Sequence, residues 1–190
     1  VVPPVLNSLR TAVMKLTGRT PMVVGPGLKT GLNIAGGNAG QVGSDLVVAA
    51  VAALREYPAP LIIIDMGTAT TLSVINRNKQ YLGGIIMPGV GVSHDSLIAR
   101  TAQLPKIALE PPKHVIGKNT IDCMKSGLLF GTACSLDGLI DRIQAELGEP
   151  CTVVATGGLA TVIVPLCKHP MILDDDLLLK GLMILYHRNQ

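Results

Sequence analysis

The chain has 190 residues, of which 48% are hydrophobic, 15% charged and 2% aromatic, and its formal net charge is +3. This composition excludes intrinsic disorder, which requires low hydrophobicity and high net charge. The weak positive charge forms no basic stripe, so a nucleic-acid surface is not expected. The densest apolar stretches, 46–54 and 61–64, fall far short of the ~20 residues that cross a bilayer, so no membrane span is expected either.

Before residue 60 the sequence predicts short elements joined by glycine-rich turns. Pro3 and Pro4 are expected to end the first strand, because proline cannot donate to a β ladder. The residues of 45–56 are small and aliphatic on all sides, which is typical of a buried helix. In chain order, the expected elements are the end of a strand over 1–5, a helix over 6–16, a short strand over 22–24, a turn over 25–27, a loop over 36–40 and a buried helix over 45–56. Ser44 and Asp45 stand where the N-cap of this last helix is expected.

Residues 61–64 give the most regular signal, an apolar and largely β-branched run of the kind found in strands buried on both faces. Further strands are predicted over 72–76 and 81–87, with a polar turn at 77–79, so that three strands form a meander. The remaining expected elements are helices over 89–102, 119–146, 159–166 and 175–188 and a buried strand over 151–155. Strands and helices in this order predict an α/β fold.

The four cysteines, Cys123, Cys134, Cys151 and Cys167, are too widely spaced for a zinc knuckle or a redox pair. Each has apolar neighbours in the sequence, so buried free thiols in a reducing cytoplasm are expected. The four histidines show no metal-ligand spacing and are expected in loops or at the surface.

An acidic residue, a glycine and a hydroxyl residue follow the most regular strand at Asp65, Gly67 and Thr68. The glycine lets the backbone approach a phosphate, the threonine offers donors, and the carboxylate can hold a cation. An ordinary tight hairpin explains the same residues, because Asp-x-Gly is common in turns. Taken alone, the motif favours the hairpin.

Asp45 and the pair Gly157 and Gly158 each allow a structural or a functional interpretation. The two glycines follow a strand and precede a helix, which suits either a bound anion or a compact turn. Asp45 either caps its helix, an interaction worth about 1 kcal/mol, or accepts a proton from a substrate hydroxyl as the catalytic aspartate of kinases does. Physical chemistry alone favours the cap.

The long helix expected over 119–146 carries two further features. Thr120 either caps this helix or turns its hydroxyl toward a ligand. Gly127 and Gly131 lie four residues apart on one face, where small residues permit the close approach of another helix. That helix can belong to the same subunit or to a second one.

Together these segments resemble the type III pantothenate kinases, in the family's order and spacing over essentially the whole chain. The matching stretches are 25–32 (Gly-Pro-Gly-Leu-Lys-Thr-Gly-Leu), 43–45 (Gly-Ser-Asp), 65–71 (Asp-Met-Gly-Thr-Ala-Thr-Thr), 83–89 (Gly-Gly-Ile-Ile-Met-Pro-Gly), 103–105 (Gln-Leu-Pro), 117–120 (Gly-Lys-Asn-Thr), 156–160 (Thr-Gly-Gly-Leu-Ala) and 177–182 (Leu-Leu-Leu-Lys-Gly-Leu). The resemblance implies a two-domain, ribonuclease-H-like (actin-like ATPase) fold. A first domain truncated at its N-terminus would span 1–58, with the helix over 175–190 packed back on it, and a second would span 59–174.

The resemblance also implies ATP-dependent phosphorylation of pantothenate, the first step of coenzyme A biosynthesis, by a cytoplasmic homodimer. The implied cations are Mg²⁺ and either K⁺ or NH₄⁺. Carried over residue by residue, the implied roles are general base and substrate contact for Asp45, substrate contacts for Gly43, Ser44, Leu46 and Thr120, ATP contacts for Thr68, Gly157 and Gly158, and monovalent-cation ligand for Asp65.

Two departures from the family's pattern keep other interpretations open. The family begins with a hairpin whose Asp-x-Gly-Asn-Thr loop grips ATP phosphates, and residues 1–4 match a strand that follows this hairpin. Leu46 stands where the family usually has an arginine that pairs with the pantothenate carboxylate, and Lys29 is a candidate replacement. The alternatives are a non-catalytic relative with a binding or regulatory role and, less favoured, a kinase of the same superfamily with another small hydroxyl substrate.

Overall fold

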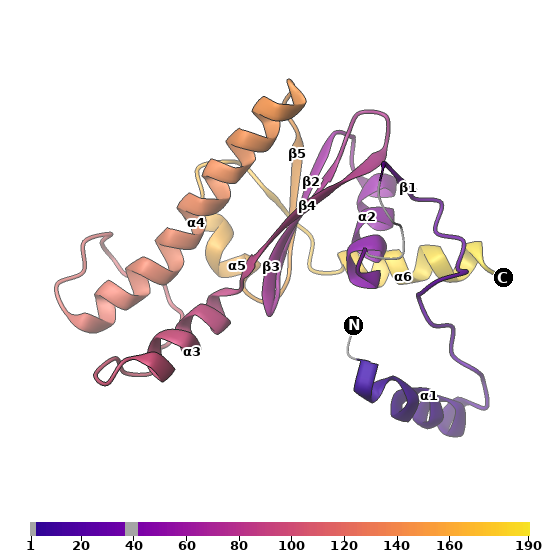
Figure 1. Cartoon of the computed structure of the whole chain (residues 1–190), viewed down its shortest axis with the longest axis horizontal. Helices are drawn as coiled ribbons and strands as arrows, with labels where there is room; N and C mark the ends of the chain where they lie inside the picture. The colour runs from indigo at the N-terminus through magenta and orange to yellow at the C-terminus, as the bar shows by residue number, and fades with distance from the viewer. Residues whose placement is uncertain (1–2, 37–41) are drawn as a thin grey trace.

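The apolar run at 61–64 lies in β2 (Leu61–Met66), inside a six-stranded mixed sheet (Figure 1). The structure is a computed structural model of the chain that describes residues 3–36 and 42–190. β2 is followed by β3 (Ala69–Ile75) and β4 (Gln80–Pro88), each antiparallel to the strand before it, which confirms the predicted meander. The strands β5 (Thr152–Thr156) and β6 (Ile172–Leu173) lie parallel to β2 beyond its other edge, and β1 (Asn33–Ile34) pairs with β4.

Helices cover both faces of this sheet, as the predicted α/β fold requires (Figure 1). One face carries α2 (Ser44–Glu56) and α6 (Leu177–Arg188), which pack against each other. The other face carries α3 (Val90–Arg100), the long α4 (Thr120–Leu147) and the short α5 (Ala160–Ile163), which continues into a 3-10 turn (Val164–Leu166). None of the helices in the described part is both long enough and apolar enough to cross a membrane.

Alternation along β2 divides its side chains between two cores, because successive residues of a strand point to opposite faces. Leu61 and Ile63 pack among alanines of α2, whereas Ile62 and Ile64 pack with residues of α4 and α5. The same alternation places Asp65, the last polar residue of the strand, on the face that α2 covers.

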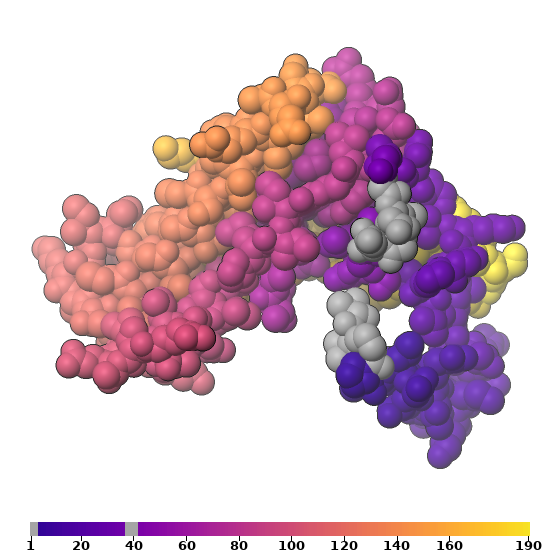
Figure 2. Space-filling view, in the orientation of Figure 1, coloured from indigo at the N-terminus to yellow at the C-terminus, as the bar shows by residue number. Residues whose placement is uncertain are grey.

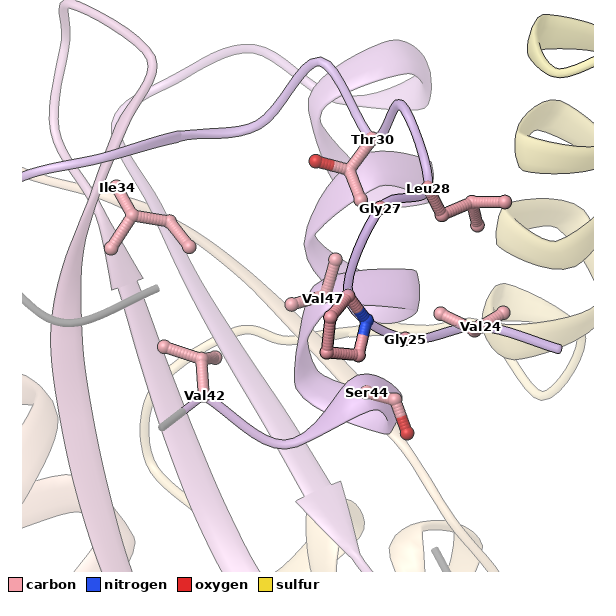
Figure 3. Close-up of a pocket in the computed structure, with 10 residues that line it drawn as sticks. Val24, Gly25, Gly27, Leu28, Thr30, Ile34, Val42, Ser44 and Val47 are labelled. Carbon is pink, nitrogen blue, oxygen red and sulfur yellow. The ribbon is translucent and has the colours of Figure 1, made fainter. Parts of the chain in front are cut away.

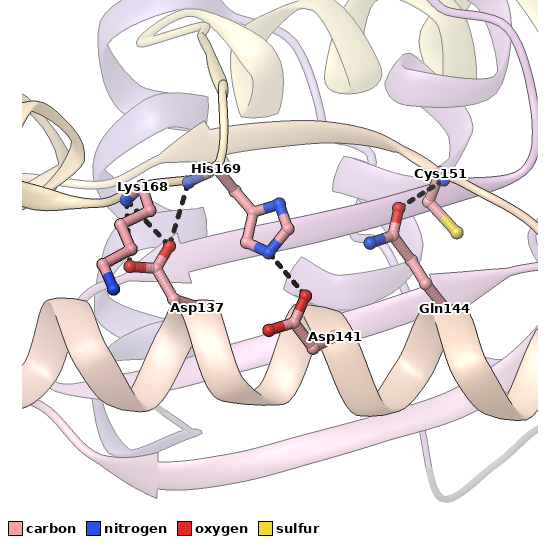
Figure 4. A network of polar contacts seen from close by, with 6 residues as sticks. All are labelled: Asp137, Asp141, Gln144, Cys151, Lys168 and His169. Carbon is pink, nitrogen blue, oxygen red and sulfur yellow. Dashed lines mark hydrogen bonds and ion pairs between the residues drawn. The ribbon is translucent and has the colours of Figure 1, made fainter.

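Polar side chains at helical spacing on α4 hold the segment that contains β5 and α5 (Figure 4). The carboxylate of Asp137 is buried and accepts hydrogen bonds from the backbone N–H groups of Lys168 and His169 at 2.9–3.1 Å. The His169 ring lies 2.8 Å from the carboxylate of Asp141, and Gln144 accepts a hydrogen bond from the first backbone N–H ahead of β5. One helix face therefore fixes both ends of the segment.

A buried polar network joins the end of α2 to the start of α6. Asp174, which is 6% exposed, accepts hydrogen bonds from the Tyr57 hydroxyl at 2.7 Å and from the Lys180 ammonium at 2.8 Å. Burial opposes ionisation of Asp174, but the hydrogen bonds from Lys180 and Tyr57 outweigh it and lower its pKa below the ordinary value. The network is therefore built around an ionised carboxylate.

Two predictions for the N-terminal segment are wrong. α1 (Pro3–Thr17) begins inside the predicted strand over 1–5, because prolines are tolerated in the first helical turn, where the N–H groups have no helical partner. Residues 1–2 lie outside the described part, as do 37–40 of the predicted loop. No strand forms over 22–24, since no described strand pairs with it. Figure 2 shows α1 standing apart from the sheet, and its side chains are mostly exposed.

The predictions for cysteines and histidines are partly wrong. All four cysteines are free, but Cys123 and Cys134 of α4 are exposed. Cys167 is half-buried, and burial raises its pKa to about 12. His94 is buried on α3, where its Nε2 accepts a hydrogen bond from the backbone N–H of Ile107.

Replacing Tyr57 by phenylalanine tests the buried network. Loss of one hydrogen bond to an ionised group predicts a destabilisation of about 1.5–3 kcal/mol at pH 7 in urea unfolding. The folded-state pKa of Asp174 is lowered, so the stabilisation is present above the unfolded pKa of about 3.9 and is lost as the pH falls through the folded value. The destabilisation should therefore disappear in strong acid. Tyr186→Phe, on the exposed side of α6, should be neutral at both pH values.

Candidate active site

The carboxyl ends of the parallel strands β2 and β5 meet at one edge of the sheet, where α2 begins. Asp65 is paired in register with Thr156, and Asp45 is the second residue of α2. In open α/β sheets ligands bind outside the carboxyl ends of the strands. The structure therefore brings Asp45, Asp65 and the residues after β5 into the part of the fold that suits a ligand.

Asp65 is half-buried, and its pKa is raised, first by burial and then by the nearby carboxylate of Asp45. No hydrogen bond from a described residue stabilises its ionised form. A carboxylate that has no donor and lies near a second negative charge attracts a proton or a cation. Among residues 3–36 and 42–190, no group of three or more His, Cys, Asp or Glu side chains could hold a metal ion.

Asp45 does not cap α2, so the predicted N-cap is wrong. The N-cap residue is Gly43, and Asp45 lies within the first turn, where its Oδ1 accepts a hydrogen bond from the backbone N–H of Leu46 at 3.0 Å. The chain enters α2 one residue earlier than predicted, which turns the carboxylate away from the capping position. A Cβ atom on Gly43 would lie 2.6 Å from Oδ1 of Asp45, so the glycine leaves room for this carboxylate.

Gly157 and Gly158 differ in what surrounds them. Gly157 has a φ of +99°, and a Cβ atom there would lie 2.6 Å from the backbone N of Met66 and 2.8 Å from Oδ1 of Asp65. Gly158 is exposed and has open space where a Cβ would stand. The helix predicted over 159–166 reduces to the four residues of α5 and a 3-10 turn, so a helix dipole contributes little here.

Thr68 lies in the tight turn between β2 and β3, and its side chain is exposed. The backbone N–H of Gly89 donates to the carbonyl of Thr68 at 3.0 Å, and a Cβ atom on Gly89 would collide with the carbonyls of Gly67 and Thr68. The start of α3 therefore packs against this turn. The Thr68 hydroxyl has no hydrogen-bond partner among the described residues and lies at the edge of the sheet where Asp65 lies.

Thr120 is not brought to this cluster. α4 begins at the far left in Figure 1, beyond α3 and on the face of the sheet opposite α2. The helix is capped by Asn119, whose Oδ1 accepts a hydrogen bond from the backbone N–H of Asp122 at 2.9 Å. The capping role considered for Thr120 is therefore wrong, and its exposed hydroxyl is free. The spacing Asn119-x-x-Asp122 is the signal that identifies the true cap.

A pocket of about 320 Å³ lies between the turn that starts at Gly25 and the first turn of α2 (Figure 3). Its lining is mostly apolar, including Pro26 and Val47, and its two hydroxyl residues are Thr30 and Ser44. Ser44 is the only member of this lining among the predicted site residues. Leu46 is half-buried in the same turn of α2 and offers no charge to a ligand.

A mixed sheet of this order, with carboxylates at its carboxyl edge, defines an α/β protein of the actin-like ATPase fold. Two solved structures share this fold. A Campylobacter jejuni protein assigned to the Baf family of transcriptional activators has a TM-score of 0.59 at 19% identity and covers 97% of this chain and 80% of its own. The ethanolamine utilization protein EutJ from Carboxydothermus hydrogenoformans has a TM-score of 0.51 at 13% identity, over 94% and 70%.

The sequence relatives identify the family within this fold. The sequence model of the type III pantothenate kinase family matches residues 1–142 of this chain. Curated type III pantothenate kinases from Geobacillus sp. (strain WCH70) and Exiguobacterium sibiricum are 46% and 47% identical over 100% of this chain, which spans 73% and 75% of their lengths. The chain belongs to the type III pantothenate kinase family.

The contrast between the two glycines after β5 gives a test of the site's geometry. Gly157→Ala forces a side chain into a left-handed backbone and against β2, so it should destabilise the protein by about 2 kcal/mol or more in denaturant unfolding. The matched change Gly158→Ala meets open space and should leave stability within about 0.5 kcal/mol. Equal effects would contradict the close approach of Gly157 to Asp65.

Proposed function

We propose that this chain transfers the terminal phosphoryl group of ATP to the hydroxyl of pantothenate and forms 4′-phosphopantothenate, the first step of coenzyme A biosynthesis. One observation carries the proposal: Asp45, which is not used as a cap, lies beside Asp65 at the carboxyl edge of the sheet in a chain of this kinase family. Membership of the family disfavours the non-catalytic alternative.

Asp45 is the proposed general base. Asp45 is half-buried at the start of α2 and follows Ser44, which lines the pocket, so we place the substrate hydroxyl at the Ser44 end of the pocket. A positioned base contributes roughly 10²–10⁴-fold to a proton-transfer step. The remaining acceleration of phosphoryl transfer comes from positioning and charge neutralisation.

The nucleotide is proposed to bind over Thr68 and Gly158, both exposed at the edge of the sheet, with Gly157 allowing close approach. Asp65 fits a K⁺ or NH₄⁺ ion, since its carboxylate has no described donor and lies beside a second carboxylate. Such a cation would supply positive charge next to the phosphates. Mg²⁺ would accompany the ATP phosphates, as it does in most kinase sites.

The substrate is proposed to occupy the pocket in Figure 3 with its hydroxyl toward Asp45. Gly43, Ser44 and Leu46 surround that end of α2. Leu46 cannot form a charge-assisted bond to the pantothenate carboxylate. We therefore assign this contact to a basic side chain elsewhere, with Lys29 on the adjacent turn as the candidate.

We also propose the division into a first domain over 1–58 with helix 175–190 and a second over 59–174, in a cytoplasmic enzyme. The close contact between α6 and α2 supports the grouping of these two helices, because a Cβ atom on Gly181 would collide with the carbonyl of Val48.

A homodimer is proposed through the outer face of α4. Gly127 and Gly131 are exposed there, and a Cβ atom on either would stand in open space. Two glycines inside a helix reduce its stability unless a close neighbour compensates. Because Thr120 lies on this helix and far from Asp45, a pantothenate contact by Thr120 is proposed to occur in the site of a second copy.

Asp45→Asn tests the proposed base. In a coupled assay of the full chain with ATP, pantothenate and K⁺, the variant should lose at least ~100-fold in kcat, because the base is removed while its shape is kept. The KM for ATP should stay near the wild-type value, and the free energy of unfolding should not fall, because loss of the Asp45 charge relieves its repulsion with Asp65. Asp175→Asn, at an exposed position, should be as active as wild type. Wild-type turnover no higher than that of Asp45→Asn would refute the kinase proposal.

Gly131→Arg tests the proposed dimer. Open space at Gly131 predicts that the monomer can accommodate the arginine. A dimer in which a second helix packs against Gly131 cannot accommodate it. Light scattering should show a dimer for wild type and a monomer for the variant at micromolar concentration. Thr161→Arg, exposed on α5, is the matched control and should remain dimeric. A monomeric wild type would rule out the dimer.

A further inference from the structure

The end of α6 holds a turn of the chain that is 160 residues away in sequence. Asn189, the C-cap residue of α6, accepts a hydrogen bond from the backbone N–H of Lys29 at 2.8 Å and donates one to the backbone carbonyl of the same residue at 3.0 Å. Its amide also donates to the carbonyl of Leu185 at 2.9 Å, which fixes its direction. The guanidinium of Arg188 donates to the next carbonyl, that of Thr30.

The turn held in this way has few hydrogen bonds of its own. Between residues 19 and 32, the backbone–backbone bonds of the described chain include that from the N–H of Leu28 to the carbonyl of Gly25, at 3.2 Å. Gly27 and Gly31 adopt φ values of +92° and +69°, which glycine reaches without strain but which do not restrict the chain by themselves. The position of the turn therefore depends on contacts from outside it.

This turn forms one wall of the pocket that the first turn of α2 lines through Ser44 and Val47 (Figure 3). Thr30 and Leu28 line the cavity on either side of Lys29, and Ser44 and Val47 of α2 line the opposite side. Leu28 also packs against the apolar cluster of Val48, Val51 and Leu185, to which α6 contributes Leu185. A displacement of residues 28–30 would change the width of the pocket without moving Asp45.

We infer that Asn189 is a positioning residue for the substrate pocket: by binding both polar groups of the Lys29 backbone, it sets the wall that faces the start of α2. An Asn side chain suits this task because its amide offers an acceptor and a donor side by side. The inference deepens the proposed function and rests on it, since the pocket is assigned to the acid that carries the hydroxyl. Neither Asn189 nor its target is signalled by local sequence.

Asn189→Leu removes both hydrogen bonds to Lys29, and the third to Leu185, at nearly constant size and is the main test. In the full chain, the KM for pantothenate should rise roughly tenfold, because the lost hydrogen bonds to Lys29 are only partly replaced by water. The values of kcat and of the KM for ATP should stay within twofold, because Asp45 and the nucleotide edge are untouched. Asn189→Asp keeps the acceptor and loses the donor, so its KM for pantothenate should lie between those of wild type and Asn189→Leu. Gln190→Leu, at the exposed neighbouring residue, is the control and should match wild type.

Hydrogen exchange provides a readout that does not depend on activity. Amides of residues 28–31 should exchange at least ~10-fold faster in Asn189→Leu than in wild type, while α2 and β2 keep their protection. Unchanged exchange, or unchanged pantothenate KM despite faster exchange, would overturn the inference. A purely structural role would instead lower Tm and raise both KM values together, and this outcome would overturn it as well. If wild type neither binds nor phosphorylates pantothenate, the proposed function fails, and the exchange rates still decide whether Asn189 holds the turn.

Discussion

Every residue of β2 except Asp65 is buried, with β3 along one edge of the strand and β5 along the other. A strand buried on both faces must supply two cores at once, and its period of two assigns each side chain to one of them. Ile62 and Ile64 stabilise the α4 face, and Leu61 and Ile63 the α2 face. This constraint leaves Asp65 facing the start of α2, where Asp45 lies. The position of the site therefore follows from the packing of the central strand.

The two carboxylates form an arrangement that the bare fold does not favour. Burial and the negative charge of Asp45 both raise the pKa of Asp65, so each makes its ionised form less stable. The glycines around the pair are equally specific, since a side chain at Gly43 or Gly157 would collide with one of the two carboxylates. Residues that reduce stability in this way are expected where a ligand compensates, and the cation proposed for this site has the matching charge.

Local patterns predicted the elements whose cause is local. The β-branched run at 61–64, the hairpins that follow it and the long helix from residue 120 were predicted within a few residues, because periodicity and turn residues determine them. The capping role of Asp45 was wrong, since the direction from which the chain enters α2 is a tertiary property. The link between Asn189 and Lys29 joins residues too far apart for any local signal. Periodicity did not predict that Asp45 and Asp65 share a site. Only the resemblance to a family predicted it from the sequence.

The proposed monovalent-cation site at Asp65, whose pKa is raised by burial and by the charge of Asp45, is tested most directly by a thermal titration. K⁺ added at constant ionic strength, with Li⁺ as the balancing ion, should raise the Tm of wild type, because a ligand that binds the folded state stabilises it by about 2.7 kcal/mol at 100 times its Kd. Asp65→Asn should melt higher than wild type without K⁺, since the unfavourable charge is gone, and should not respond to K⁺. Equal responses of both proteins to K⁺, or none in wild type, would contradict the account.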